Sequence, residues 1–264
     1  IHDGRVTPFI AVPTTAGTGS ETTMNGVLAD RQQGFKKSFR HPSLVPLAAL
    51  VDPDLLATCP RDLIAANGCD ALSQLLESYL STNASPFSDG LAVGAIEQMG
   101  RGLIPLWQSE GRDEQARAAV AYGSMISGIT IANAGLGTVH GLAGPIGGLY
   151  TIPHGVACGT LLGEANQVNI EILLRQDAGS VALQKYRIIG EKLGFCGRQT
   201  KGIDCLRALS DGLMEWVETM QIPRLGMFGI SSGDIPKIIS LSDQKANPVV
   251  LSEEEFAGIV AARI

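Results

Sequence analysis

One long stretch with helical periodicity reads RDLIAANGCDALSQLLESYL, residues Arg61–Leu80. Its apolar residues recur at helical spacing, so the stretch predicts a single helix. Asp70, Gln74 and Glu77 stand at i, i+4 and i+7, which places them on one face of that helix. Asp70 follows Gly68 among apolar neighbours, and this predicts a carboxylate that points into a cavity. Glu77 is more typical of a structural ion pair than of a ligand.

Helical periodicity continues through most of the chain downstream. We predict further helices at residues 86–107, 112–132, 153–173, 181–193, 202–220, 234–241 and 253–262. Upstream, short apolar runs at 8–12 and 47–51 predict buried strands, and residues 26–30 and 35–40 predict a hairpin around the turn 31–34. Near residue 55 the pattern changes from short apolar runs to helical periodicity. This change predicts a small β-rich part, 1–55, and a large helical domain, 56–264.

The amino-acid composition argues against several classes of protein. The chain has 264 residues, of which 45% are hydrophobic and 17% charged, and a net charge of -6. These values exclude a disordered chain, and the absence of a basic face argues against a nucleic-acid partner. No apolar run of about 18 residues occurs, so no membrane span is expected. The five cysteines form no CxxC pair, which disfavours a disulfide framework or a cysteine zinc site and favours a reducing cytoplasm.

A loop rich in glycine and hydroxyl groups follows the first predicted strand. It reads PTTAGTGSE, residues 13–21. Its glycines allow backbone N–H groups to approach an anion, and its hydroxyls can donate to phosphate or ribose. It matches neither GxGxxG nor a Walker A loop, so an ordinary Thr/Gly loop remains the alternative.

Two of the four histidines lie in a glycine-rich region. The stretches GLGTVHGLAGPIGG, residues 135–148, and IPHG, residues 152–155, contain His140 and His154. With Asp70 they could form a site for Fe(II), Zn(II) or Mn(II). The alternative is two buried histidines that backbone carbonyls satisfy. His2 and His41 are expected on the surface or in loops.

In this order and spacing, the three motifs resemble the iron-containing (group III) alcohol dehydrogenase family. The resemblance implies an N-terminal α/β nucleotide-binding domain and an all-helical C-terminal domain, similar to dehydroquinate synthase. The GGGS-type pyrophosphate loop of the family is not in this chain. We therefore expect a mainly α structure: a dehydroquinate synthase-like helical domain after a short β-rich remnant of the nucleotide-binding domain.

The resemblance also implies a role for individual residues. The hydroxyl loop would contact NAD or NADP, a lysine of the hairpin would reach the nicotinamide ribose, and an apolar side chain would line the cofactor cleft. Three ligands would hold Fe(II) or Zn(II), which acts as a Lewis acid during hydride transfer. The positions concerned are Thr14, Thr15, Thr18 and Ser20 in the loop, Lys36 (or Lys37) in the hairpin, Leu56 in the cleft, and the catalytic ligands Asp70, His140 and His154.

Two positions depart from the family pattern. Gln74 stands where the fourth metal ligand is usually histidine, and Gly144 replaces a histidine near the nicotinamide. An amide oxygen is a weaker ligand than imidazole, and both changes enlarge the site. We expect NAD(P)-dependent interconversion of an alcohol and an aldehyde or ketone, with a bulky small-molecule substrate and a homodimer. The alternatives are a truncated or metal-poor helical domain without catalysis and a lyase of dehydroquinate synthase type.

The remaining cysteines and tryptophans have ordinary interpretations. Cys69 adjoins Asp70, and Cys158 follows His154 by four residues, so either could lie near a metal. A buried free cysteine is nevertheless more typical of a small hydrophobic core residue. Trp107 and Trp216 are expected to pack in the core.

Overall fold

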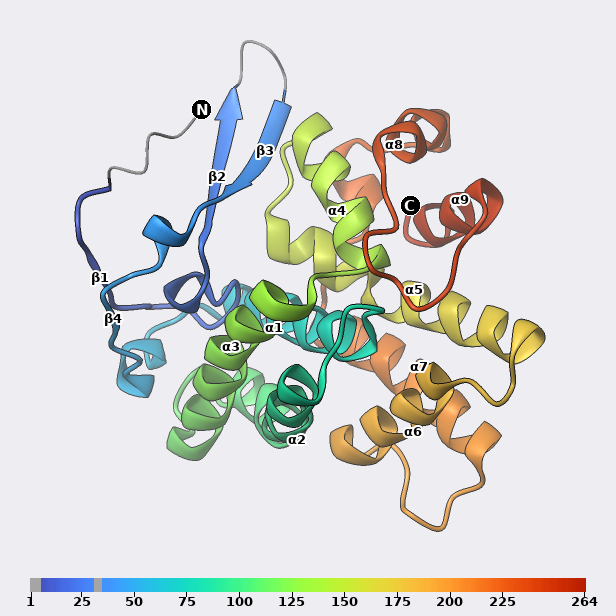
Figure 1. Ribbon diagram of the computed structural model, residues 1–264, viewed down its shortest axis with the longest axis horizontal. Helices are drawn as coiled ribbons and strands as arrows, with labels where there is room; N and C mark the ends of the chain where they lie inside the picture. Colours follow the sequence, from blue (N-terminus) through green and yellow to red (C-terminus); the bar gives the residue numbers. More distant parts are fainter. Residues whose placement is uncertain (1–5, 31–34) are drawn as a thin grey trace.

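The computed structural model describes residues 6–30 and 35–264, with side chains for all of them except 29, 30 and 35–37. Helix α1 (Arg61–Leu80) lies at the centre, and α2 (Pro86–Gln108), α3 (Glu114–Ala134) and α5 (His154–Gln176) pack around it (Figure 1). Sixteen of the 20 residues of α1 are buried. Asp70, Gln74 and Glu77 are among the buried residues, so the polar face of α1 is enclosed by the neighbouring helices.

The other helices complete the domain. They are α4 (Thr138–Leu149), α6 (Val181–Leu193), α7 (Gly202–Thr219), α8 (Ile235–Leu241) and α9 (Glu253–Ala261). Every helix predicted from the sequence is present, with ends that differ by at most three residues. Helix α2 begins as expected, because Ser85 caps it in a capping box with Ser88 and Pro86 takes the first position.

Helix α4 is the element that the sequence did not predict. Glycine and an internal proline, Pro145, argue against a helix on propensity alone. Burial against the rest of the core overrides that propensity, since Val139, Leu142 and Ile146 are at most 1% exposed. This packing turns the glycine-rich histidine stretch into a helix that directs His140 inward.

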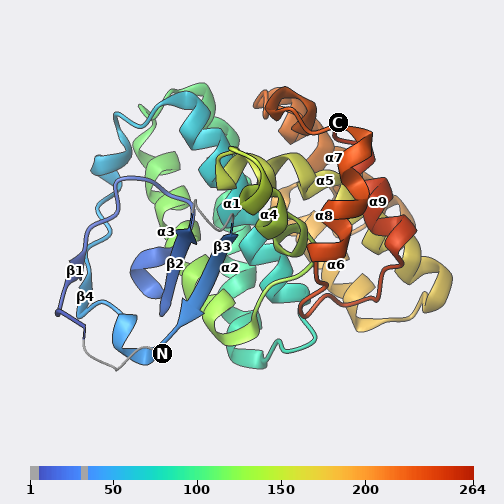
Figure 2. The same cartoon turned by 90° about the horizontal axis from the view of Figure 1, so that it is seen from above.

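The β-rich part consists of two small sheets (Figure 2). Strands β2 (Asn25–Asp30) and β3 (Phe35–Arg40) pair antiparallel, which confirms the predicted hairpin; its turn, 31–34, lies outside the described residues. The strands predicted at 8–12 and 47–51 are reduced to β1 (Ile10–Ala11) and β4 (Ala48–Ala49), which pair in parallel. The prediction that they are buried is wrong, because they pair only with each other among the described residues, and Ile10 is 60% exposed. Short 3-10 turns follow at Ser20–Thr22, Pro42–Leu44 and Pro53–Leu56.

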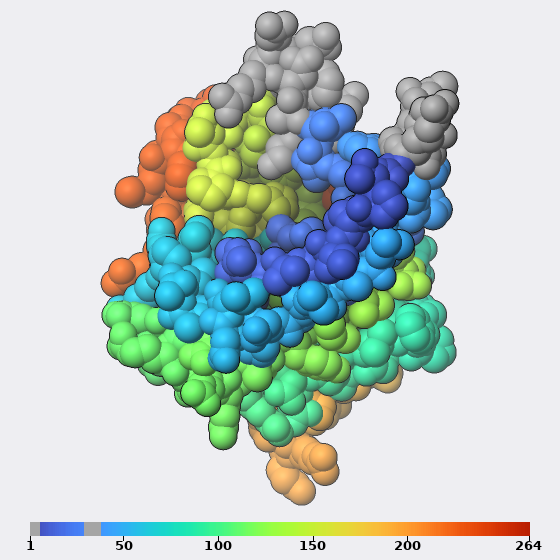
Figure 3. Space-filling view, turned by 90° about the vertical axis from the view of Figure 1, so that its left-hand side faces the viewer, coloured from blue at the N-terminus to red at the C-terminus, as the bar shows by residue number. Residues whose placement is uncertain are grey.

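The PTTAGTGSE loop rests directly on α3. Gly19 has a positive φ of 59°, and a Cβ on Gly128 would lie 2.1 Å from the Gly19 carbonyl oxygen. Thr22 donates its hydroxyl to the carbonyl of Met125 at 2.8 Å. The N-terminal segment consequently runs across one face of the helical domain (Figure 3). Two facing glycines therefore fix the position of the loop relative to α1 and α3.

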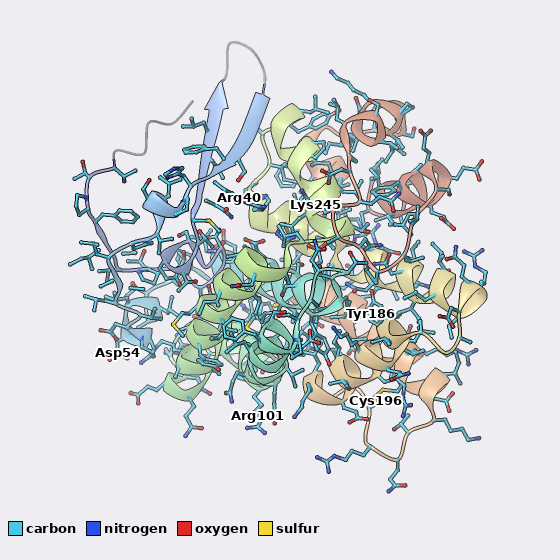
Figure 4. The ribbon with its side chains drawn as sticks, viewed as in Figure 1. Arg40, Asp54, Arg101, Tyr186, Cys196 and Lys245 are labelled. Atoms are coloured by element: carbon cyan, nitrogen blue, oxygen red, sulfur yellow. A yellow bond between two sulfur atoms is a disulfide. The ribbon has the colours of Figure 1, made fainter. Side chains whose placement is uncertain are left out.

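A disulfide is present that the sequence analysis did not expect. Cys196 and Cys205 are bonded, with their Cα atoms 5.3 Å apart, and join the turn after α6 to α7. Their proximity comes from the packing of α6 against α7, which no cysteine spacing reveals. Cys196 lies at the opposite side of the molecule from the β2–β3 hairpin (Figure 4). Cys59, Cys69 and Cys158 are free and buried.

Among the described residues, no single helix has the length and apolarity to cross a membrane, and the only combination that does is the α3–α4 pair, which is bent by 99°.

Candidate metal centre

Three helices bring the predicted ligands together. Asp70 projects from α1, His140 from α4, and His154 from the first turn of α5. The Oδ1 atom of Asp70 lies 3.2 Å from His140 Nε2 and 3.9 Å from His154 Nε2. Asp70 and His140 are buried, whereas the side chain of His154 is 35% exposed. The cluster is thus closed toward the core and open on the side of His154.

Glu77 holds the His140 ring in place. Its Oε2 lies 2.6 Å from His140 Nδ1, and its Oε1 accepts the backbone N–H of the same residue at 3.2 Å. Because an ionised carboxylate only accepts hydrogen bonds, Nδ1 carries the proton. Nε2 is then the nitrogen that faces Asp70. This contact agrees with the prediction that Glu77 is an ion-pair partner rather than a ligand.

The charges of the cluster attract a cation. Burial raises the pKa of Asp70, but hydrogen bonding to His140 and the charges of both histidines outweigh it and hold that pKa below its usual value. Burial lowers the pKa of His140, yet Cys158, Glu77 and Asp70 raise it well above the ordinary range. The pKa of His154 is raised, chiefly by Cys158. A buried group of anions and imidazoles therefore favours bound positive charge, as protons or as a metal ion.

A fourth donor joins the cluster. Donor atoms of Asp70, His140, His154 and Cys158 all lie within 4.8 Å of one another. Sequence reasoning gave Cys158 little weight, although its i+4 spacing from His154 on α5 was the signal. Gln74, the predicted fourth ligand, is buried on α1, and its Oε1 accepts a hydrogen bond from Ser127 Oγ at 2.7 Å.

A cavity of about 610 Å³ opens beside the cluster. Asp70 and His154 form part of its wall, together with Thr18 of the hydroxyl loop. The carboxylate on α1 therefore faces a cavity, as the sequence predicted. Trp107 lines the cavity too, and the guanidinium of Arg61 lies 3.6 Å above the centre of its ring. Trp107 is buried, as expected, but it also forms part of this wall.

The predicted cofactor residues belong to the hydroxyl loop, the hairpin and the turn that precedes α1. The hydroxyls of Thr14, Thr15, Thr18 and Ser20 belong to exposed residues. Leu56 is buried and borders a small space that Thr15 also lines. The backbone of Lys36 pairs with Ala29 in the hairpin, but the side chains of Lys36 and Lys37 lie outside the described part of the structure.

The remaining positions of interest are also placed. His41 begins the 3-10 turn Pro42–Leu44 and accepts the backbone N–H of Ser43, while His2 lies outside the described residues. Gly144 is exposed on α4, and a Cβ there would meet nothing within 4 Å. The absence of a histidine at that position therefore leaves open space.

The donor set fits a divalent metal. Carboxylate and imidazole are ordinary ligands for zinc and non-haem iron. Metal-bound histidines commonly donate their second N–H to a carboxylate, as His140 does to Glu77. The residues of this cluster thus match the requirements of such an ion in chemistry, burial and charge.

Comparison with known proteins identifies the family of the chain. A sequence profile described as "Fe-containing alcohol dehydrogenase family, C-terminal" matches residues 64–263, and one described as "Iron-containing alcohol dehydrogenase" matches residues 2–53. The probable alcohol dehydrogenase EutG of Escherichia coli is 34% identical over 259 residues, which cover 97% of this chain and 62% of that protein. An NAD-dependent methanol dehydrogenase of Bacillus methanolicus is 38% identical over 151 residues, 57% of this chain and 39% of that protein.

A solved structure agrees in fold as well. The crystal structure of a 1,3-propanediol oxidoreductase superposes with a TM-score of 0.86 at 32% identity, covering 96% of this chain and 65% of that one. The chain thus spans less than two thirds of the length of these relatives. Because the first profile alone matches most of the sequence, the chain belongs to the iron-containing alcohol dehydrogenase family.

Proposed function

We propose that this chain contains the metal and substrate site of an NAD(P)-dependent alcohol dehydrogenase, which interconverts an alcohol and an aldehyde or ketone. One observation carries the proposal. Donor atoms of Asp70, His140 and His154 converge from three helices at the wall of a cavity that Thr18 of the hydroxyl loop also lines. A small alcohol or aldehyde would enter this cavity. The relatives named above support an alcohol as the substrate class.

The residues have distinct tasks in this proposal. When bound, the metal would supply a Lewis acid for the substrate oxygen, and NAD or NADP would carry the hydride. Asp70, His140 and His154 would hold the metal, Fe(II) or Zn(II), and Glu77 keeps His140 Nε2 directed at the site. His154 lines the cavity and is half-buried, so a substrate in the cavity could contact its ring.

The cofactor would lie against the hydroxyl loop. Thr14, Thr15, Thr18 and Ser20 offer hydroxyl donors, Leu56 an apolar wall, and Lys36 a cation for the nicotinamide ribose. The positioning of this loop on α3 by Gly19 and Gly128 supports the assignment, because a fixed loop presents its donors at little entropic cost.

Residues 1–55 are, in this proposal, the end of a nucleotide-binding domain, and residues 56–264 the helical metal domain. The two family profiles, at 2–53 and 64–263, support this division. The exposure of apolar side chains in β1 and next to β4 supports it too, since Ile10 is 60% and Leu47 75% exposed. A homodimer in the cytoplasm belongs to the same proposal.

A substrate larger than a short primary alcohol belongs to the proposal as well, although Gly144 is exposed and is not among the residues that line the cavity. We expect larger aldehydes to react faster than ethanol is oxidised. Equal rates on ethanol and on a larger aldehyde would contradict this part of the proposal.

Metal content tests the proposed function. Elemental analysis of the chain purified without added metal should give close to one iron or zinc, and His140→Ala should lose it. His41→Ala is the matched control, because His41 lies in a loop away from the cluster. A folded chain that holds no metal would refute the metal-assisted reaction and favour a helical domain without catalysis.

A further inference from the structure

Cys158 lies where a metal ligand would have to be. It follows His154 by one helical turn on α5, so both side chains lie on the same face of that helix. The thiol is fully buried, and its Sγ lies 3.6 Å from His140 Nε2 and 3.7 Å from His154 Nε2. The sulfur thus faces the two nitrogen atoms that the proposed metal requires.

Gln74, the other candidate for a fourth ligand, is already engaged. The oxygen of its side-chain amide is the atom that would coordinate, and Ser127 on α3 donates a hydrogen bond to it at 2.7 Å. Ser127 thus takes one of the two lone pairs of the amide oxygen in a buried hydrogen bond, and losing that bond on coordination would cost about 1–3 kcal/mol. Cys158 needs no such exchange, because its sulfur is already in contact with both imidazoles.

We propose that Cys158, as a thiolate, is the fourth protein ligand of the metal in place of Gln74, and that the site prefers zinc to iron. The inference rests on the proposed function, because it assumes that Asp70, His140 and His154 hold a metal. Binding replaces the S–H bond by an S–metal bond and displaces any proton on the two ligating imidazole nitrogens, and all these protons pass to solvent. One carboxylate and one thiolate then neutralise a divalent ion, with two neutral imidazoles as the remaining ligands. Thiolate favours zinc among the metals that this family could use.

Cobalt(II) is the probe that reports a sulfur ligand directly. A cobalt–thiolate bond gives an intense charge-transfer absorption in the near-ultraviolet, which oxygen and nitrogen ligands do not give. We expect this band when cobalt(II) is added to the metal-free chain. Cys158→Ser should remove the band and weaken zinc binding by at least about 100-fold, since loss of an outer partner alone costs 10–100-fold. Chelator competition measures the zinc affinity.

Cys69→Ser is the matched control. Cys69 is also a fully buried free cysteine, and it is the neighbour of Asp70 on α1. Burial raises the pKa of its thiol to about 12, and its sulfur is not among the clustered donors. This variant should keep the band and the zinc affinity. Gln74→Ala should also keep the band, and circular dichroism verifies that each variant is folded.

The outcomes separate this inference from the proposed function. Cobalt bound without a charge-transfer band, or unchanged zinc affinity in Cys158→Ser, overturns the cysteine ligand and leaves the proposed metal site intact. Loss of zinc binding in Gln74→Ala but not in Cys158→Ser identifies the amide as the ligand. If only Cys69→Ser loses the band, the sulfur ligand is Cys69 on α1, and the assignment to Cys158 on α5 is wrong. No metal in the unmodified chain overturns both proposals.

Discussion

Replacing Glu77 by glutamine should weaken metal binding while leaving the chain folded. Glu77 accepts two hydrogen bonds from His140, one from ring Nδ1 at 2.6 Å and one from the backbone N–H at 3.2 Å. A glutamine is nearly the same size, but it has one oxygen acceptor and an NH₂ group that only donates. The substitution therefore removes one acceptor for two buried donors and little else.

Both orientations of the new amide are unfavourable. If its oxygen accepts the backbone N–H, its NH₂ faces Nδ1, and the ring must move its proton to Nε2, the nitrogen needed for the metal. If its oxygen accepts Nδ1–H instead, the buried backbone N–H of His140 loses its partner, at about 1–3 kcal/mol. We expect zinc affinity to fall about 10- to 100-fold, equivalent to about 1.4–2.7 kcal/mol.

Chelator competition with zinc on the metal-free chain is the assay. Glu171→Gln is the control: Glu171 is an exposed glutamate on α5 that accepts a hydrogen bond from Gln167 at 3.0 Å. It should bind zinc as the unmodified chain does. A folded Glu77→Gln variant with zinc affinity within about twofold of the unmodified chain would refute the reasoning about the His140 tautomer.

Three further predictions concern stability. Gly128→Ala places a Cβ 2.1 Å from the carbonyl oxygen of Gly19, where ordinary contact begins at 3.4 Å. Urea denaturation should therefore show that the free energy of unfolding falls by about 1–3 kcal/mol. Gly144→Ala is the control and should show no loss, because a Cβ there meets nothing within 4 Å. Burial raises the pKa of Glu21 above its value in the unfolded chain, so stability falls as the pH rises from the unfolded value through the raised one and stays reduced above it. Glu21→Gln should melt higher than the unmodified chain at pH 7 and equally below about pH 4, and a difference that persists in acid would contradict this. Arg117→Ala removes a buried guanidinium that pairs with Asp54 at 2.8 Å and should cost about 1.5–3 kcal/mol, whereas Asp54→Asn should cost less because Asp54 is exposed.

Local signals were sufficient for the long helices. Helix α1 has the bounds predicted from its periodicity, and α2 starts at the predicted cap, Ser85. These features depend on residues within a few turns of each other, so the sequence contains them. The strands predicted at 8–12 and 47–51 are longer than β1 and β4, because an apolar run does not show how many of its residues pair with a neighbouring strand.

Helix α4 could not be predicted in the same way. Its glycines and Pro145 disfavour a helix, and only the buried face with Leu142 and Ile146 stabilises one. The disulfide between Cys196 and Cys205 is similar, because it follows from the packing of α6 on α7. For α4 the deciding contacts override local propensity, and for the disulfide they depend on how two consecutive helices pack against each other.

The candidate metal site shows the same difference between what local motifs predict and what helix packing decides. Asp70, His140 and His154 could be proposed from their residue types and motifs, and the structure brings their donor atoms together. The fourth donor depends on what each candidate already binds. Gln74 has the expected position on α1, but its amide oxygen already accepts a hydrogen bond from Ser127 on α3. Cys158 has an ordinary sequence context, but α4 carries His140 to its sulfur. Helix contacts that no local motif specifies therefore determine which side chain is free to complete the site.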